Sequence, residues 1–320
     1  MKIVNLDSAT TNPGDLSWDF LNNYADEVVI YQRTSPDEVV ERAKGAEILI
    51  VNKTLLPAEV LNALSPELKY IGLQSTGYNV VDLNEATRLG ITVCNIPSYS
   101  TNAVAQEVFA CILGFSNLVE LHSESVHNGE WCSCPDFCYW KAPLFELAGK
   151  TIGIIGFGTI GRRVAEIAQA FKMNILVYSR HEKDLSSFSC AHQVELDDLL
   201  YNSDIVTCHV PLTAETTGLI NKETLSKMKS SAILINTSRG PVVNEAELAE
   251  ALNSGRIAAA ALDVLSEEPA NSSNPLLTAK NCIITPHIAW AAKETRARLL
   301  SVLEENLRCW LEGKPQNKVN

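Results

Sequence analysis

The sequence lacks a long apolar run, a secretory leader and an excess of basic residues. No segment approaches the roughly 18–20 consecutive apolar residues that a membrane-spanning helix needs, so we expect no membrane partner. The first residues, MKIVNLDSAT, hold too short an apolar stretch for a secretory signal and predict a strand. With 26 Lys and Arg against 38 Asp and Glu, the formal net charge is −12, which disfavours nucleic acid as a partner.

The cysteine pattern offers little support for a disulfide framework. The nine cysteines are an odd number, are scattered along the chain and follow no export signal, so we predict reduced thiols and a cytoplasmic location. Cys132, Cys134 and Cys138 form the one cluster. A zinc site usually has a fourth ligand and two C-x₂₋₄-C pairs, which this C-x-C-x₃-C pattern with no nearby His does not provide, so we predict a structural loop and no metal.

What the sequence does contain is a series of short runs rich in Val and Ile, separated by helical patterns. The runs include KIVNL (2–6), EVVIY (27–31), EILIV (47–51), YIGLQ (70–74), ITVCN (91–95), TIGIIG (151–156), NILVY (174–178), DIVTC (204–208), AILIN (232–236), AAALDV (259–264) and CIIT (282–285). Continuous rather than alternating apolar runs indicate strands that are buried on both faces of a parallel sheet. The 320 residues therefore predict an α/β protein with two doubly wound, Rossmann-like domains.

The helical segments indicate where the two domains meet. Ser35-Pro36-Asp37-Glu38 predicts a helix-capping box, and Asn244 with Glu247 predicts a second one. Residues 101–125 predict one long helix that leaves the first domain, and residues 291–313 predict another that returns to it. We therefore expect a discontinuous domain, residues 1–100 plus 292–320, with residues 101–291 inserted as a domain of their own.

A G-x-G-x-x-G motif runs from Gly156 through Gly158 to Gly161. It follows the strand TIGII, opens the helix IGRRVAEIAQAF and precedes another strand, which is the context of a dinucleotide site. Gly156 suits the tight turn, Gly158 lets the backbone approach a pyrophosphate, and Gly161 allows close packing of helix and strand. The inserted domain is therefore predicted to be an NAD(P)-binding Rossmann domain, with the pyrophosphate at the positive end of the helix.

The second strand of this domain ends in Tyr178, Ser179 and Arg180. An NAD-specific site usually has an acid here, which binds the ribose 2′-hydroxyl, but Ser179 stands in its place. Arg180 can instead bind a 2′-phosphate, because its planar guanidinium donates two parallel hydrogen bonds. We therefore favour NADP, or the use of both NADP and NAD; the alternative is a solvated basic loop.

Three polar segments follow strands of the inserted domain and supply Arg239, Glu268 and His287. Ligands of open α/β sheets bind at the carboxyl ends of the strands, so these side chains are expected to meet there. Reduction of a 2-oxo acid needs a cation for the carboxylate, which Arg239 can supply, and a proton donor, which His287 can be. Glu268, bonded to His287, would hold its ring and favour its protonated form. Taken singly, each residue is more typical of a surface charge or a loop.

Several segments resemble the D-isomer-specific 2-hydroxyacid dehydrogenases over nearly the whole chain. They are LAGKTIGIIGFGTIGRRVA (147–165), HVPLTAETTGLIN (209–221), LINTSRGPVVNEAELAEAL (234–252), ALDVLSEEP (261–269) and ITPHIAW (284–290). Within that family the glycerate dehydrogenase (hydroxypyruvate reductase) branch is the most similar, through NPGDLSWD (12–19), STGYNVVDL (75–83) and CPDFCYWKAPL (134–144).

The resemblance implies a flavodoxin-like substrate (catalytic) domain at 1–100 plus 292–320 and a role for each matching site residue. Arg239 would bind substrate, His287 would donate the proton, Glu268 would support His287, and Asp263 would hold the nicotinamide carboxamide. The N–H groups of Ser75, Thr76 and Gly77 would bind the substrate carboxylate. The expected cofactor contacts are Gly156, Gly158, Thr159, Ile160, Gly161, Ser179, Arg180, Val210, Pro211, Thr237, Ser238 and Asp263. A homodimer with residues 122–148 at or near its interface is also implied.

The predicted reaction is the reduction of hydroxypyruvate and glyoxylate to D-glycerate and glycolate. An alternative is another D-2-hydroxyacid, such as D-lactate, because this chain has Asn79, Val80 and Gln106 where many members have other residues. Another class of alternative is a cofactor-sensing module like the C-terminal-binding-protein corepressors, which keep the same three catalytic residues. The sequence shows no long disordered extension of the kind those proteins carry.

Overall fold

The computed structural model describes all residues from Met1 to Asn320, which form two compact units. Unit 1 comprises Met1–Ser100 and Ala291–Asn320, and unit 2 comprises Thr101–Trp290. Each unit is built on one sheet in which all strand pairs are parallel. The predicted class, α/β with two doubly wound domains, is confirmed.

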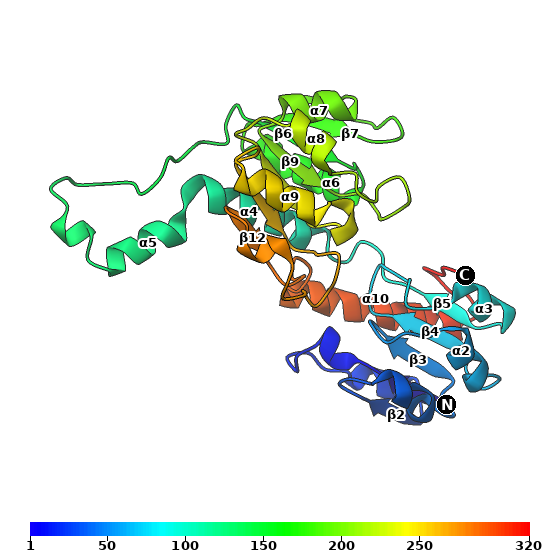
Figure 1. Cartoon of the computed structure of the whole chain (residues 1–320). Helices are drawn as coiled ribbons and strands as arrows, with labels where there is room; N and C mark the ends of the chain where they lie inside the picture. The colour runs from blue at the N-terminus through cyan, green and yellow to red at the C-terminus, as the bar shows by residue number, and fades with distance from the viewer. The chain divides into compact units, whose positions relative to one another are not determined.

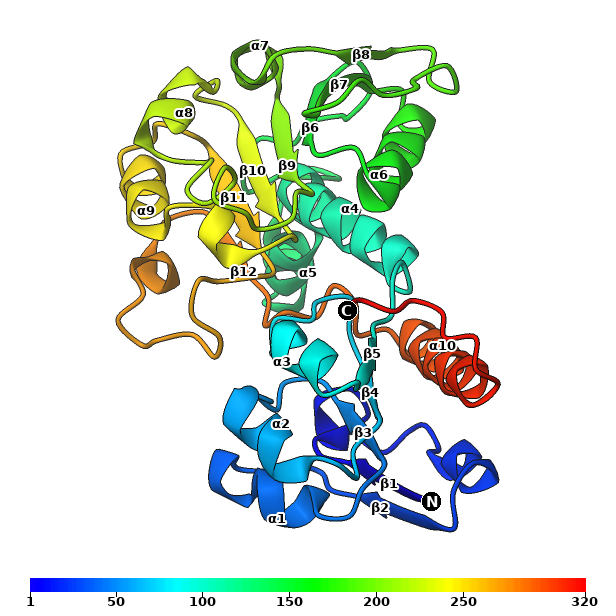
Figure 2. The same ribbon diagram turned by 90° about the vertical axis from the view of Figure 1, so that its right-hand side faces the viewer.

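Unit 1 has a five-stranded sheet in the order β2-β1-β3-β4-β5, which is the flavodoxin-like order. The strands are β1 (Lys2–Asn5), β2 (Glu27–Ile30), β3 (Ile48–Val51), β4 (Tyr70–Leu73) and β5 (Thr92–Cys94). Short helices α1 (Val39–Ala43), α2 (Ala58–Leu64) and α3 (Leu83–Arg88) lie on one side of this sheet, and α10 (Lys293–Leu311) lies on the other (Figure 2). The predicted capping box is confirmed at Ser35 and Glu38.

Helix α10 packs on the sheet of unit 1 although about 190 residues of unit 2 precede it. Leu303 is buried against Gly72, where an added Cβ would lie 2.9 Å from the Leu303 side chain. The rings of Tyr70 and Trp310 lie 4.9 Å apart. Asn306 donates to the carbonyl oxygen of Asn95 at 2.9 Å. Apolar packing and a buried hydrogen bond therefore hold the last helix on β4 and β5.

Unit 2 has a seven-stranded sheet in the order β12-β11-β10-β9-β6-β7-β8. Its strands are β6 (Thr151–Ile155), β7 (Asn174–Tyr178), β8 (Ala191–Gln193), β9 (Ile205–Cys208), β10 (Ile233–Asn236), β11 (Ala259–Leu262) and β12 (Cys282–Ile284). One face is covered by α4 (Thr101–Asn117) and α6 (Thr159–Ala170), and the other by α7 (Leu196–Asn202), α8 (Lys222–Lys227) and α9 (Glu245–Asn253) (Figure 2).

Two elements differ from the sequence prediction. The single helix expected at 101–125 is broken at Leu118, whose φ is 49°, so that α5 (Val119–His127) starts a separate segment. Strand β8 at the sheet edge was not predicted, because the sequence Ala-His-Gln has no apolar run. The second capping box is only half formed: Asn244 accepts from the N–H of Glu247, whose carboxylate instead accepts from the N–H of Lys222.

The segment from Leu118 to residue 148, here called the arm, extends away from the sheet of unit 2 (Figure 1). The arm contains α5 and the cysteine cluster, and it returns to the sheet at β6. No single helix has both the length and the apolar composition to cross a membrane; α4 and α5 reach them only as a pair bent by 53°.

The register of the unit 2 sheet aligns the carboxyl ends of its strands. The paired residues form one row across the sheet: Ile284, Leu262, Asn236, Cys208, Ile155 and Tyr178. The residue after each of these strand ends therefore leaves the sheet at the same edge. Side chains on neighbouring loops start close together there, because neighbouring strands are only about 4.8 Å apart. This edge of the sheet is where the predicted site residues of unit 2 come together.

Candidate active site

Glu268 and His287 form a hydrogen-bonded pair at this edge. Nδ1 of His287 lies 2.7 Å from Oε2 of Glu268, and the two side chains are 31% and 34% exposed. The other carboxylate oxygen accepts from the N–H of Leu265 at 3.1 Å. Because a carboxylate is an acceptor, it selects the ring form with a proton on Nδ1. Nε2 makes no hydrogen bond within the chain, so it can exchange a proton with a ligand.

The loop that carries His287 is anchored on Asp263, the buried residue that follows β11. One carboxylate oxygen of Asp263 accepts from the hydroxyl of Thr285 at 2.6 Å and the N–H of Ile288 at 2.8 Å, and the other accepts from the N–H of Ala289 at 2.9 Å. The N–H of His287 donates to the Asp263 carbonyl oxygen at 2.8 Å. Asp263 therefore holds the turn on both sides of His287, and the φ of His287 is 53°.

Arg239 stands on the turn after β10, and Asn236 shapes that turn. The fully buried side chain of Asn236 accepts from the N–H of Ser238 at 3.0 Å and from its hydroxyl at 2.7 Å, and it donates to the carbonyl oxygen of Arg239 at 2.9 Å. The exposed guanidinium of Arg239 donates to the Ser238 carbonyl oxygen at 2.7 Å. Sequence reasoning overlooked Asn236, although a polar residue that ends a buried apolar strand is a signal for such a role.

Gly240 brings the Arg239 turn into contact with the loop that carries Glu268. A Cβ at Gly240 would lie 1.9 Å from the backbone carbon of Leu265 and 2.3 Å from the backbone nitrogen of Ser266. Only a residue without a side chain allows this approach. The backbone positions of the Arg239 turn and of the Glu268 loop are thus mutually dependent. Arg239 and His287 share no direct hydrogen bond and lie on loops separated by β11.

The glycine motif forms a cradle that fits a pyrophosphate. Gly156 has a φ of 95°, and a Cβ there would lie 2.6 Å from the carbonyl oxygen of His209. A Cβ at Gly161 would lie 2.2 Å from the Gly156 carbonyl oxygen, whereas at Gly158 nothing lies within 4 Å. No side chain caps α6, whose first residues are Thr159 and Ile160. The turn is therefore closed by backbone contacts, while Gly158 and the start of the helix face open space suited to phosphate.

The remaining expected cofactor contacts follow β9 and β10. The hydroxyl of Thr237 is buried without a hydrogen-bond partner, which leaves a polar atom for a ligand to satisfy. The hydroxyl of Ser238 is already bound to Asn236. Val210 lies close to the glycine motif, since a Cβ at Gly156 would be 2.9 Å from its Cγ1. The carbonyl oxygen of Pro211 accepts a hydrogen bond from the hydroxyl of Thr216.

Two titratable groups near this edge have shifted pKa values. Burial, reinforced by the charge of Asp263, raises the pKa of Glu107 in α4. Burial lowers the pKa of His209 to about 3, so its ring is neutral at neutral pH. Nε2 of His209 bonds to the hydroxyl of Thr207 at 2.9 Å, and Nδ1 has no partner. Charge at the edge therefore comes from other groups, Arg239 among them, and not from His209.

Ser179 and Arg180 line a hollow of about 560 Å³ at the end of β7. The other lining residues are Tyr178, Gln193, Val194, Glu195 and Asp198. Arg180 is exposed and makes no salt bridge of 4 Å or less, so its guanidinium is available to an anion. A hydrogen bond from Thr213 and, to a smaller extent, the charge of Arg180 lower the pKa of Glu215. Glu195 and Asp198 add two carboxylates to the same hollow, which oppose any bound phosphate.

Ser75, Thr76 and Gly77 lie in unit 1, in the turn after β4. The carbonyl oxygens of all three residues accept hydrogen bonds that shape the turn. The N–H of Ile96 donates to that of Ser75, the side chain of Asn95 donates to that of Thr76 at 2.8 Å, and the Ser75 hydroxyl donates to that of Gly77 at 2.6 Å. The N–H groups of the three residues donate to no acceptor within the chain. They are therefore free to bind an anion such as a carboxylate.

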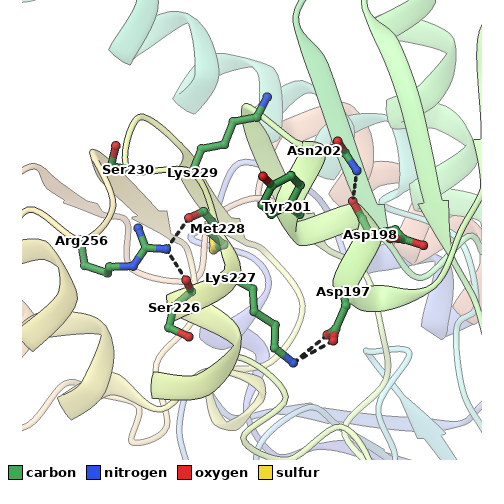
Figure 3. Close-up of a pocket in the computed structure, with 10 residues that line it drawn as sticks. All are labelled: Asp197, Asp198, Tyr201, Asn202, Ser226, Lys227, Met228, Lys229, Ser230 and Arg256. Atoms are coloured by element: carbon green, nitrogen blue, oxygen red, sulfur yellow. Dashed lines mark hydrogen bonds and ion pairs between the residues drawn. The ribbon is translucent and has the colours of Figure 1, made fainter.

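Another hollow, of about 750 Å³, lies between α7 and α8 (Figure 3). Its cations already have partners in the chain. Lys227 binds Asp197 at 2.9 Å, and Arg256 donates to carbonyl oxygens (Figure 3). Lys229 binds Asp204 at 2.9 Å. This hollow therefore offers no free cation for a ligand. No group of three or more His, Cys, Asp or Glu side chains is arranged to hold a metal ion.

Comparison with known proteins gives a consistent picture. The family model described as "D-isomer specific 2-hydroxyacid dehydrogenase, NAD binding domain" matches residues 109–289. The chain is 48% identical over 323 residues to a hydroxypyruvate reductase of Blautia hydrogenotrophica, with 100% of each chain covered. It is 40% identical over 321 residues to a glycerate dehydrogenase of Methylorubrum extorquens, with 99% of this chain and 98% of that one covered.

A solved structure also resembles the whole chain. It is an acyclic imino acid reductase in complex with NADPH and D-Arg, with a TM-score of 0.87, 33% sequence identity and 100% of each chain covered.

We predict that Gly240→Ala destabilises unit 2, because the new methyl group overlaps the backbone of Leu265 and Ser266. Overpacking of this kind costs about 1–3 kcal/mol or more. Thermal unfolding of the purified variant would show the loss. Gly114→Ala is the matched control, since its Cβ would lie 3.8 Å from the nearest side-chain atom, in ordinary contact. Equal melting temperatures for both variants and the wild type would contradict the contact.

Proposed function

The chain belongs to the D-isomer-specific 2-hydroxyacid dehydrogenase family, and we propose that its substrates are hydroxypyruvate and glyoxylate, reduced to D-glycerate and glycolate. As a member of the family it is an oxidoreductase that transfers a hydride between NAD(P)H and small 2-oxo acids. The observation that carries the proposal is the 2.7 Å pair of Glu268 and His287, on the sheet edge shared with Arg239 and the glycine motif. The hydroxypyruvate reductase and glycerate dehydrogenase relatives support this choice of substrate.

In the proposed mechanism His287 moves the proton. When it is bound, the nicotinamide supplies the hydride that reaches the substrate carbonyl carbon. Protonated His287 donates its Nε2 proton to the carbonyl oxygen, which becomes the product hydroxyl, and the imidazole is left neutral. Glu268 holds the ring in place through its hydrogen bond with Nδ1. In the reverse direction neutral Nε2 accepts the hydroxyl proton.

Arg239 provides the charge in this mechanism. Its guanidinium binds the substrate carboxylate and stabilises the negative charge that develops on the carbonyl oxygen. The free N–H groups of Ser75, Thr76 and Gly77 also suit a carboxylate, so unit 1 is the proposed substrate domain. Unit 2 is the proposed cofactor domain. Asp263 is proposed to hold the carboxamide as well as the His287 loop, although its carboxylate already accepts three hydrogen bonds.

For the cofactor we propose NADP in preference to NAD. Ser179 has no charge to repel a 2′-phosphate, and Arg180 beside it is exposed and unpaired in the hollow after β7. The unpartnered hydroxyl of Thr237 and the open space at Gly158 suit the rest of either dinucleotide. All nine cysteines are free thiols, which is consistent with the proposed cytoplasmic location.

We further propose a homodimer that uses the arm. Seven large apolar side chains are exposed along it: Val119, Leu121, Val126, Trp131, Phe137, Trp140 and Leu144. Phe137 is 88% exposed, the extreme case among them. The arm is nevertheless held in shape by the ion pair of Lys141 with Glu130 at 2.6 Å and by the bond from Trp131 to the Phe137 carbonyl oxygen. An ordered apolar surface of this kind is typical of an interface between subunits.

We predict that Arg239→Ala lowers kcat/KM for hydroxypyruvate by about 10²–10³-fold, because the charge opposite the developing oxyanion is lost. The measurement is steady-state kinetics on hydroxypyruvate, glyoxylate, pyruvate and 2-oxoglutarate, each with NADH and NADPH. The wild type is expected to turn over hydroxypyruvate at about 1–10³ s⁻¹.

The control for Arg239→Ala is Arg163→Ala. Arg163 forms a surface pair with Glu166 at 2.6 Å, so its loss should change kcat/KM by about twofold at most. Wild-type kinetics in Arg239→Ala would remove Arg239 from the site. A wild type that binds cofactor but reduces none of the four acids would contradict the proposed substrates.

We predict that Arg180→Ala weakens the use of NADPH much more than that of NADH. The charged hydrogen bonds to the 2′-phosphate are lost, which should lower kcat/KM for NADPH by about 10–100-fold. NADH has no 2′-phosphate and should change little. Parallel cofactor titrations at saturating hydroxypyruvate provide the test. Equal losses for the two cofactors would show that Arg180 does not contact the 2′-phosphate.

We predict that the double variant Phe137→Ser, Trp140→Ser is monomeric. Light scattering after size-exclusion chromatography should give the 35.0 kDa of one chain, and twice that mass for the wild type. The control is Tyr201→Ser, which removes an aromatic ring that is 73% exposed but lies outside the arm. A monomeric wild type, or a dimeric double variant, would refute the role of the arm.

A further inference from the structure

The loop between β7 and β8 carries the residues proposed to select the cofactor. It starts with Ser179 and Arg180 and ends at Cys190, before the short edge strand β8. The loop is largely polar, and only Phe188 among its side chains is buried. A polar edge loop has few apolar contacts to hold its backbone, so its shape depends on the hydrogen bonds that it makes.

Most of those bonds near Arg180 come from one side chain, Gln193 at the end of β8. Its Oε1 accepts from the N–H of Lys183 at 2.9 Å. Its Nε2 donates to the carbonyl oxygen of Ser179 at 3.1 Å and to that of His181 at 3.2 Å. A carboxamide has one acceptor oxygen and two donor hydrogens, and all three functions are used here. The residues on both sides of Arg180 are thus bound to the same group.

The far end of the loop is anchored separately, on α6. Arg162 donates to the Asp184 carbonyl oxygen at 3.0 Å. Its guanidinium lies 5.3 Å from the ring centre of Phe157 and 5.6 Å from that of Phe188. This anchor does not bond to the backbone between Ser179 and Lys183. The position of Arg180 therefore depends on Gln193.

Small displacements of Arg180 matter because its surroundings are acidic. Glu195 and Asp198 line the same hollow as Arg180 and Gln193. A 2′-phosphate placed there is attracted by one guanidinium and repelled by two carboxylates. Since these energies vary inversely with distance, a shift of Arg180 by an ångström or two alters the balance.

We propose that Gln193 is a positioning residue for cofactor selection, whose carboxamide holds the backbone from Ser179 to Lys183 so that Arg180 faces the 2′-phosphate of NADP(H). The inference rests on the cofactor contact proposed above for Arg180. Gln193 itself need not touch the cofactor, because its polar atoms are occupied by the loop.

The test compares Gln193→Met, Arg180→Ala and the control His192→Met in the full chain. Methionine keeps the length of glutamine but removes all three hydrogen bonds. His192 is the exposed neighbour on β8, and its side chain makes no hydrogen bond. The readouts are the Kd values for NADP⁺ and NAD⁺ from calorimetry, and the hydrogen exchange rate of the Lys183 amide.

For Gln193→Met we expect the Kd for NADP⁺ to rise about tenfold, that for NAD⁺ to change less than about threefold, and the Lys183 amide to exchange faster. His192→Met should match the wild type. If Gln193→Met melts early, Gln193→Asn replaces it: it keeps the carboxamide and adds no charge, but it is one methylene shorter and cannot reach all three partners, so it should weaken NADP⁺ selectively as well.

The variants separate the role of Gln193 from the contact of Arg180 with the 2′-phosphate. If Arg180→Ala weakens NADP⁺ alone while the Gln193 variants leave both Kd values unchanged or raise them equally, the role of Gln193 is refuted and the contact of Arg180 stands. If Arg180→Ala affects NADP⁺ and NAD⁺ equally, the 2′-phosphate contact fails, and the inference fails with it.

Discussion

The parallel register of the unit 2 sheet is the constraint on which the candidate site depends. It aligns Ile284, Leu262, Asn236, Ile155 and Tyr178 in one row, so that the loops carrying the imidazole, the guanidinium and the glycine motif leave the sheet together. None of these groups is near another in the sequence. Burial of short apolar strands on both faces, which is a requirement of packing, thus also collects the chemistry at one edge.

Within that edge, backbone contacts and buried polar side chains position the reactive groups. Asn236 shapes the Arg239 turn, Asp263 holds the loop of His287, and Gly240 lets the Arg239 turn touch the loop that carries Glu268. Arg239, Glu268 and His287, which we propose act on the substrate, are exposed or partly exposed, whereas Asn236 and Asp263 are buried. This division follows from physical chemistry, because hydrogen bonds offset the cost of burying Asn236 and Asp263 and also restrict their motion.

Most of the fold could be predicted from the sequence, because each strand except the exposed edge strand β8 is a short apolar run and each unit repeats the alternation of strand and helix. The pairing of Glu268 with His287 was also predicted, and the structure has the two side chains in contact. Contacts that depend on loop conformation could not be predicted. The break at Leu118 occurs inside an apolar helical pattern without Gly or Pro, and the three bonds of Gln193 depend on how residues 179–183 fold back onto β8.

The return of the chain to unit 1 has a consequence for synthesis on the ribosome. Strand β5 is bordered by the last residues: the N–H of Asn95 donates to the carbonyl oxygen of Asn317, and that of Val319 donates to Val93. These partners leave the exit tunnel only after all of unit 2 has been made. Unit 2 is continuous and can fold during translation, while the first hundred residues must wait, with one face of their sheet and one edge uncovered, until α10 emerges.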